Sequence, residues 1–391
     1  MSTTTRHILI IGGGLAGPCL ALSLARRNIR STIFEIRPTR SDMGGSISLG
    51  PNALQVLDRY AGVYDQIRAA GFSYHRFGAY ADDGEKFGEI AAGEEGKGAE
   101  GYPSVRIMRS TLHKRKTSKG VTAYFEDGSN AKGDILIGAD GMHSKVRQHV
   151  LGSEAPTPTF DGMCIVYGFL PASSAIPPSA DFAFPAFMFT PSGVFMTIPI
   201  DPEGKTLAWV INQSVEERSR DEWRELERSG EAARLAKADY DDIQTQPVRS
   251  LLDNADETKA RLWAAYSIPE LPKWHKSRVC LIGDAAHGLP PNGGQGSAMA
   301  FEDAAILTRL LTSKDTTNYD QLFRQFEAIR RPRIKRLRQL SKASGAAKAK
   351  SGRVGWYVKK WAFRAFFAWN RGVLQHAEQP TYDVDQVNLE V

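Results

Sequence analysis

The chain has few cysteines and no long apolar run. Only three cysteines occur in 391 residues, at the widely spaced positions Cys19, Cys164 and Cys280. This spacing gives neither a metal site nor a disulfide framework, so we expect reduced thiols in a cytoplasmic protein. No segment stays apolar over the roughly 20 residues that a membrane-spanning helix needs. The first residues also lack the apolar region of a secretion signal.

The chain also lacks an internal repeat and a strong excess of either charge. The formal net charge is +6, and much of the excess lies in residues 330–338. On a helix this cluster is most simply a solvated face, so no nucleic-acid partner is expected. Hydrophobic residues make up 42% and charged residues 24%, which is typical of a globular protein. The length exceeds one average domain and suggests two intertwined lobes.

A strand, a turn, a helix and a second strand are expected near the start. Residues 7–11 predict a buried parallel strand, residues 15–27 a helix, and residues 31–34 the second strand. The turn leaves unpaired backbone N–H groups at the start of the helix, where phosphate oxygens can bind. A glycine-rich turn that holds nothing is the alternative, and the register of all these elements argues against it.

The residues of this turn fit a dinucleotide. Gly12 permits the tight turn, Gly14 lets the backbone approach a pyrophosphate, and Gly17 lets the helix pack on the strand. Glu35 ends the second strand, roughly 20 residues beyond the glycines, where a carboxylate can accept hydrogen bonds from a ribose. The sequence therefore predicts an adenine dinucleotide, either NAD or FAD.

A later strand-and-turn motif favours FAD. Residues 279–282 predict a buried strand that ends at Asp284, whose carboxylate can bind the hydroxyls of a ribityl chain. NAD has no such chain. A glycine-rich stretch from Gly293 then opens a helix that runs to about Leu310, and its positive end can stabilise a reduced flavin.

A third motif lies between these two. Residues 134–138 predict a strand, Asp140 follows in the turn, and Ser144 and Arg147 stand on the next helix. The alternative interpretation makes Asp140 a turn former and Arg147 a surface residue. The order of all three motifs along the chain indicates a flavin dinucleotide.

With these motifs, residues from about 6 to 338 resemble the single-component FAD-dependent aromatic hydroxylases. These monooxygenases have the para-hydroxybenzoate hydroxylase fold and include fungal polyketide-modifying and tetracycline-modifying members. The resemblance implies an α/β protein with a Rossmann-type FAD-binding domain, an inserted antiparallel-sheet substrate domain and C-terminal helices. It implies FAD-binding positions at Gly12, Gly14, Gly17, Glu35, Arg37, Ser48, Arg109, Asp140, Arg147, Asp284, Gly294, Gly296 and Ser297.

The resemblance also implies a reaction. NADPH or NADH reduces FAD, and the reduced flavin takes up molecular oxygen as a C4a-hydroperoxide. The distal oxygen then hydroxylates or epoxidises a small aromatic or polyketide-like substrate, as in secondary metabolism. Pro290, Pro291 and Gly293 would lie beside the flavin ring. Arg40 is a candidate for the nicotinamide phosphates, with an exposed loop arginine as an equal alternative.

No catalytic base can be assigned, and other functions stay open. His287 fits a structural role better than acid–base work. Most aromatic residues of the inserted sheet are expected to be core rather than substrate pocket. A flavoprotein oxidase, reductase or halogenase is the nearest alternative function. A flavin-binding protein without activity is another.

The substrate domain is expected as an insertion. Strand-like runs at 164–170, 183–190, 194–200 and 206–211 predict an antiparallel sheet. The expected division of the chain has an FAD-binding domain in three parts (1–73, 105–160 and 269–338), substrate-domain segments (74–104 and 161–268), and a C-terminal helical segment with a tail (339–391).

Two stretches need separate interpretation. After His113 only seven residues precede the next strand-like run, whereas the family has a helix and a strand there. A parallel crossover needs a dozen or more residues, so this shortening predicts weaker FAD binding or loss of activity.

Residues 356–371 interleave aromatic and basic side chains. A helix there could contact a membrane surface, but we expect it to pack on the protein.

Overall fold

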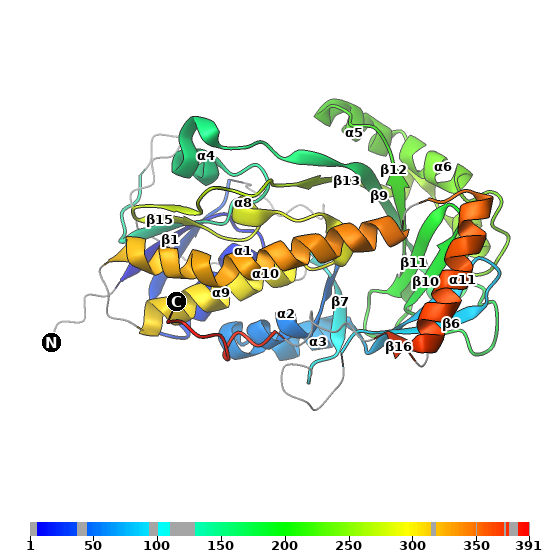
Figure 1. Ribbon diagram of the computed structural model, residues 1–391, viewed down its shortest axis with the longest axis horizontal. Coiled ribbons are helices and arrows are strands. Elements are labelled where there is room, and N and C mark those ends of the chain that lie inside the picture. The colour runs from blue at the N-terminus through cyan, green and yellow to red at the C-terminus, as the bar shows by residue number, and fades with distance from the viewer. Residues whose placement is uncertain are drawn as a thin grey trace.

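The computed structural model describes residues 6–36, 45–93, 101–109, 130–313, 318–348, 350–370, 373–374 and 382–390. A parallel sheet with helices against it forms one end of the molecule, and a larger sheet forms the other (Figure 1). The long helix α10 (Tyr319–Lys348) extends from the first of these regions toward the second. The chain is thus an α/β protein with the two-lobed organisation expected from the sequence.

The first lobe is built on a five-stranded sheet. Its strand order is β14-β15-β8-β1-β2, and every pair is parallel except the short hairpin β14-β15. Apolar, branched residues fill its central strands, and Ile8, Leu9 and Ile10 of β1 are fully buried, as is typical of a parallel sheet. The strands are β1 (His7–Ile11), β2 (Arg30–Phe34), β8 (Ile135–Gly138), β14 (His275–Lys276) and β15 (Val279–Leu281).

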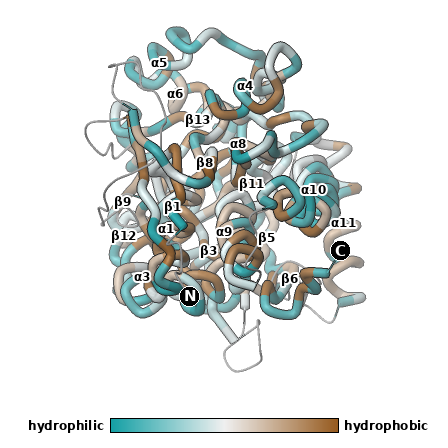
Figure 2. Tube along the Cα trace, turned by 90° about the vertical axis from the view of Figure 1, so that its left-hand side faces the viewer, coloured by the Kyte–Doolittle hydropathy of each residue, from teal (hydrophilic) through white to brown (hydrophobic). Residues whose placement is uncertain are grey.

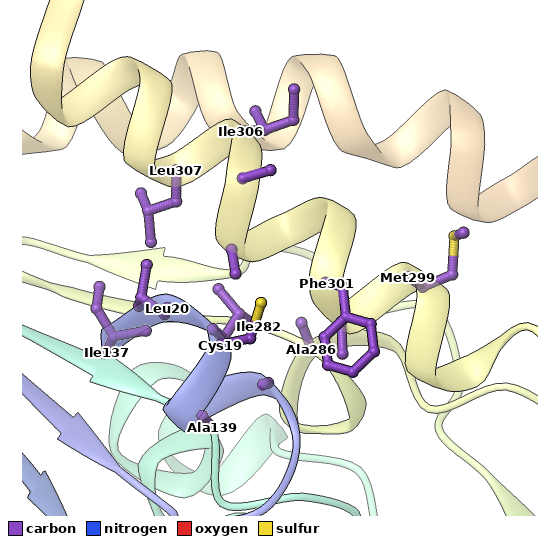
Figure 3. Close-up of a cluster of buried hydrophobic side chains, with 14 of the residues drawn as sticks. Cys19, Leu20, Ile137, Ala139, Ile282, Ala286, Met299, Phe301, Ile306 and Leu307 are labelled. Carbon is purple, nitrogen blue, oxygen red and sulfur yellow. The ribbon is translucent and has the colours of Figure 1, made fainter. Parts of the chain in front are cut away.

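The core of this lobe lies between its sheet and two helices, α1 (Ala16–Ala25) and α9 (Gly296–Ser313). Figure 3 shows Leu20 of α1 near Ile137, with Leu307 of α9 above them. All three side chains are fully buried. The three cysteines are free and buried, consistent with the expected absence of disulfides.

The second lobe is an eight-stranded sheet of order β13-β9-β12-β11-β10-β5-β6-β16. The four strand-like runs predicted for this sheet correspond to β9, β10, β11 and β12, and every pair among them is antiparallel, as expected. Two further pairs of the sheet are parallel, β5 with β10 and β6 with β16. Each parallel pair joins strands from separate parts of the chain, so no local hairpin fixes their direction. The strands are β5 (Arg76–Ala81), β6 (Lys86–Ala91), β9 (Thr159–Pro171), β10 (Ala186–Thr190), β11 (Gly193–Pro199), β12 (Thr206–Ser214), β13 (Arg261–Ser267) and β16 (Val373–Leu374).

A small antiparallel sheet of order β3-β7-β4 lies at the junction of the lobes. Its strands are β3 (Ser46–Leu49), β4 (Phe72–Tyr74) and β7 (Ser104–Met108). The remaining α-helices are α2 (Pro51–Val56), α3 (Tyr64–Ala70), α4 (Lys145–Leu151), α5 (Arg220–Arg228), α6 (Glu231–Ala238), α7 (Val248–Asn254), α8 (Asp284–His287) and α11 (Arg353–Trp369).

The basic stretch of α10 corrects an expectation. Hydrophilic residues dominate this helix in Figure 2, but Arg330 is fully buried and Arg333 is largely buried. Only part of the stretch, such as Lys335 and Arg336, is exposed. The solvated-face interpretation is therefore wrong for its first half, because α10 packs against acidic residues of α9.

The C-terminal helix α11 packs on the eight-stranded sheet. Its Trp356, Phe363 and Phe367 lie against Phe87 and Phe189 of that sheet. The expected packing is thus confirmed, although α10 rather than α11 extends between the lobes (Figure 1). Among the described residues, no helix is both long and apolar enough to cross a membrane.

Candidate functional site

The three motifs meet at the carboxyl edge of the parallel sheet. Strand β1 leads to Gly12, β8 leads to Ala139 and Asp140, and β15 leads to Gly283. Gly12 has φ +113°, and a Cβ on it would lie 2.3 Å from the carbonyl oxygen of Ala139. The first two motifs therefore touch through their backbones, and only glycine allows that approach.

The start of α1 is packed on one side and open on the other. A Cβ on Gly17 would lie 2.1 Å from the carbonyl oxygen of Gly12, so the helix sits directly against the turn. A Cβ on Gly14 would meet no described atom within 4 Å. Gly14 thus exposes backbone to a space that a ligand can enter, at a helix N-terminus that favours negative charge.

Glu35 closes the same turn. One of its carboxylate oxygens, Oε2, accepts a hydrogen bond of 2.7 Å from the Gly13 N–H. The side chain is exposed at the same edge of the sheet. The structure therefore brings the acid at the end of β2 next to the glycine turn.

The second motif is connected by hydrogen bonds to α4 and to the third motif. The Asp140 carboxylate accepts hydrogen bonds from the Ser144 hydroxyl (2.6 Å) and from the Lys145 N–H (2.8 Å), so it caps the start of α4. Arg147 is buried, and its guanidinium donates to the carbonyl oxygens of Met142 (2.5 Å) and Ala285 (3.1 Å). Burial lowers the pKa of Arg147. Arg147 thus joins the second motif to the third.

Asp284 follows Gly283 at this edge, and Arg109, which follows β7, is near enough for its charge to act on Asp284. The Asp284 side chain is exposed to solvent, yet the surrounding protein raises its pKa by desolvation, and the positive charge of Arg109 opposes that rise. Among the described residues, no group forms a hydrogen bond with the Arg109 guanidinium, which leaves its donors available.

The loop before α9 forms the far end of the edge. Pro290 accepts a hydrogen bond of 2.8 Å from the Ser341 hydroxyl of α10, and residues 291–293 form one helical turn. A Cβ on Gly294 or Gly296 would meet no described atom within 4 Å. The N-terminus of α9, with Ser297 in its first turn, therefore faces open space as the start of α1 does.

A buried charge cluster behind α9 was not predicted from the sequence. Asp303 accepts hydrogen bonds from the Gly283 N–H (2.8 Å), from His287 Nε2 (2.6 Å) and from Arg330 Nε (2.7 Å). Arg330 also pairs with Glu302 at 2.7 Å. The charges of His287 and Arg330 outweigh desolvation and hold the pKa of Asp303 below its ordinary value. His287 is therefore a buried member of this cluster, which agrees with the structural role predicted for it.

The signal for this cluster was present but ambiguous. Glu302 and Asp303 are adjacent on a helix that otherwise reads as apolar, and their arginine partner lies 27 or more residues away. Sequence spacing does not reveal which surface of α10 turns toward α9. The cluster fixes the Gly283 N–H, and through Glu302 it holds Asn52 at 2.8 Å.

A second group of polar residues lies at the junction of the lobes. Arg106 donates to the hydroxyls of Ser46 and Ser48, both at 2.9 Å, and Tyr74 donates to Ser48 at 3.1 Å. Desolvation lowers the pKa of Arg106 to about 10, while nearby tyrosines including Tyr167 oppose this. Its hydrogen-bond partners among the described residues are neutral hydroxyls and include no carboxylate.

Aromatic side chains line the same junction. Tyr74 meets Phe77 edge to face with ring centres 4.9 Å apart, and Tyr167 meets Phe169 at 5.9 Å. Phe77, Phe169 and Met196 are partly buried and pack against the hydrophobic cluster that contains Tyr74. The junction therefore carries both a desolvated arginine and a group of aromatic side chains.

Some predicted residues cannot be placed. Arg37 and Arg40 lie outside the described residues, and so does the short stretch after His113. No group of three or more potential metal ligands is found in the part of the chain that the structure describes. Within that part, the predicted site residues from Gly12 to Ser297 lie along one edge or, for Ser48 and Arg109, in or directly after the small sheet at the junction.

The chain matches a family model described as FAD binding domain, over residues 5–131 and 103–341. The two matches overlap in the region that contains the short stretch after His113. The chain is 29% identical to 3-amino-4-hydroxybenzoate 2-monooxygenase from Streptomyces platensis, covering 88% of this chain and 89% of that protein. It is 30% identical to 3-hydroxybenzoate 6-hydroxylase from Klebsiella oxytoca, covering 84% and 85%.

The fold is also found in a solved structure. HpxO from Klebsiella pneumoniae, in complex with FAD and uric acid, superimposes with a TM-score of 0.76 at 20% identity, covering 93% of this chain and 94% of that one. At this identity the likeness shows the fold alone. Together with the family match and the curated relatives, it confirms that this chain belongs to the FAD-binding-domain family of flavin-dependent aromatic monooxygenases.

Proposed function

We propose that the protein hydroxylates a small aromatic acid, with FAD bound along the carboxyl edge and NAD(P)H as the reductant. The observation that carries this proposal is the pairing of two open helix N-termini on one edge, at Gly14 and at Gly294–Gly296. Asp284 lies at the same edge, and Arg109, whose guanidinium has no hydrogen-bond partner among the described residues, acts on it through its charge. This arrangement fits an extended cofactor with phosphates at one end and a flavin at the other.

The residues of the edge fit such a cofactor in chemistry as well. The start of α1 would hold the pyrophosphate, and Glu35 the ribose next to it. Asp284 would accept hydrogen bonds from the ribityl hydroxyls. When bound and reduced, FAD supplies the activation of molecular oxygen and its transfer to an aromatic carbon.

The chain contributes position and charge. The N-terminus of α9 would stabilise negative charge on the reduced flavin, because its backbone N–H groups and helix dipole point there. The loop at Pro290 and Pro291 is held by Ser341 and would close one side of the ring. NAD(P)H would dock transiently, as is typical of this family.

The residues at the junction support an acidic aromatic substrate. Arg106 is a desolvated cation with only hydroxyl partners among the described residues, so an anion next to it would be favoured. The flanking aromatic residues suit a planar ring. The curated relatives act on hydroxybenzoates according to their names, which agrees with this chemistry.

The proposal is tested with the purified protein. A flavin absorbance spectrum and a flavin-to-protein ratio come first, followed by NADH and NADPH consumption against a panel of hydroxybenzoates and matched neutral phenols. Oxygen-18 from labelled molecular oxygen should appear in the product. If an aromatic acid stimulates NADH or NADPH consumption but no oxygen-18 appears in the product, the protein would instead be an oxidase or reductase. A colourless protein that takes up no added FAD would contradict the proposal and agree with the shortening after His113.

Arg106 provides the variant that tests the substrate class. Arg106→Met should raise the KM for an aromatic acid by about tenfold to a hundredfold, because a charged hydrogen bond contributes roughly 1.5–3 kcal/mol. The KM for the matched neutral phenol should change little. Arg106→Lys keeps the charge but not the forked geometry of the guanidinium. Its KM for the aromatic acid should therefore lie between those of the native protein and Arg106→Met. An equal loss for both substrates would assign Arg106 a structural role.

A further inference from the structure

The outer face of α11 is apolar throughout. The helix buries Trp356 and Phe367 against the sheet, but Trp361 and Trp369 on the other side are 67% and 88% exposed. Every side chain of α11 that the structure describes as exposed is apolar. In Figure 1 the helix lies at the outer end of the molecule, away from the parallel sheet. This face therefore has no part in the candidate site.

The area of this face exceeds that of an ordinary surface patch. Its four aromatic residues, Tyr357, Trp361, Phe366 and Trp369, together present on the order of 500 Å², if a fully exposed aromatic side chain offers about 200 Å². Exposed valines and alanines bring the face to roughly the 800 Å² that each partner contributes to a standard-size protein interface. Monomers rarely leave an apolar patch of that size open.

The charges of α11 argue against a membrane as the occupant. Lys360 pairs with Asp82 and Asp83, and Arg364 donates to Glu85 at 2.8 Å. All three acids belong to the turn between β5 and β6. An interfacial membrane helix needs free cations on a solvated polar face to attract anionic lipid. Here these two cations are already neutralised, and the opposite face is packed on the protein.

The spacing of large and small residues fits a second copy of the same helix. Trp361, Ala365 and Trp369 lie four residues apart and form one ridge. In a two-fold symmetric pair, each tryptophan can pack beside the small Ala365 of the other copy, since an isologous interface repeats every contact twice. We propose that the protein is a homodimer in which the outer faces of two α11 helices pack together about an axis near Ala365.

Sedimentation of the flavin-loaded protein over a wide concentration range tests this proposal. We expect a dimer for the native chain. Trp361→Glu and Trp369→Glu should each weaken dimerisation at least about thirtyfold, as expected for an aromatic hot spot. Trp263→Glu is the matched control, because Trp263 is also exposed but lies on the edge strand β13.

Flavin content and far-ultraviolet circular dichroism of each variant check that it folds. A native chain that stays monomeric at every concentration would overturn the proposal. The proposal would also be overturned if the Trp361→Glu and Trp369→Glu variants fold normally and still form the dimer. Flotation of the native protein with phosphatidylserine vesicles would overturn it in favour of a membrane surface.

Discussion

The first and third glycine motifs lie at the same edge of the same sheet but are supported in different ways. The turn at Gly12 is held by close backbone packing, against Ala139 on one side and Gly17 on the other. The turn at Gly283 is held by an ion: its N–H donates to Asp303, which belongs to a fully buried charge cluster. One end of the candidate cofactor site is therefore positioned by steric fit and the other by electrostatics.

This difference has an energetic consequence. Close packing fails locally, because a new methyl group must displace the atoms it meets. A buried ion network fails as a whole, because removing one partner leaves the others charged and unpaired in a medium of low dielectric constant. We therefore expect the third motif to be the more sensitive of the two to a single substitution in its supporting residues.

The largest expected effect is that of Arg330→Met. It leaves Glu302 and Asp303 buried without their arginine, which should lower the free energy of unfolding by about 3–5 kcal/mol. Urea unfolding of the flavin-free protein measures this. Arg224→Met removes an exposed pair with Asp221 and is the control, with a change within about 0.5 kcal/mol. Equal losses of stability in the two variants would contradict the claim that the buried ion cluster supports the turn at Gly283.

Gly17→Ala should have the next largest effect. Its Cβ would lie 2.1 Å from the Gly12 carbonyl oxygen, so the flavin-free protein should lose up to about 3 kcal/mol of stability. Gly14→Ala is the matched variant, because its Cβ meets only open space. That variant should unfold like the native protein and yet bind FAD more weakly in a fluorescence titration. Destabilisation by both variants would show that Gly14 is packed after all.

The sequence revealed the parts of the fold that local chemistry determines. Strands at 7–11, 135–138 and 279–281 were predicted because branched apolar runs end in glycine turns. The direction of β5 beside β10 was not, because these strands come from distant segments and no turn joins them. In the candidate site, Asp284 was found through its motif, whereas Asp303 was hidden because its partners depend on how α9 and α10 pack.

A pH experiment sharpens the electrostatic side of the comparison. Since the pKa of Asp303 is lowered in the folded protein, its contribution to stability is complete above the ordinary value of 3.8 and declines as the pH falls below it. His287→Gln removes one cause of that lowering. The variant should lose about 1.5 kcal/mol at neutral pH, the lower end of the range for a hydrogen bond to a charged group. Its acid-unfolding midpoint should also move to higher pH, as followed by tryptophan fluorescence. His149→Gln, on the exposed side of α4, should leave the midpoint unchanged.

The smallest change in stability is expected for Asp284→Asn, and it has the opposite sign. Burial raises the pKa of Asp284, so its negative charge opposes folding increasingly as the pH rises above 3.8, whereas that of Asp303 favours folding. The amide removes this cost, and the flavin-free protein should become slightly more stable at neutral pH, by a few tenths of a kcal/mol because solvent reaches the side chain. FAD binding should weaken about tenfold or more with the loss of a charged acceptor. Asp241→Asn, an exposed control, should change neither quantity. A variant that became less stable without its flavin would show that Asp284 supports the fold rather than the cofactor, and the two carboxylates would then have the same role.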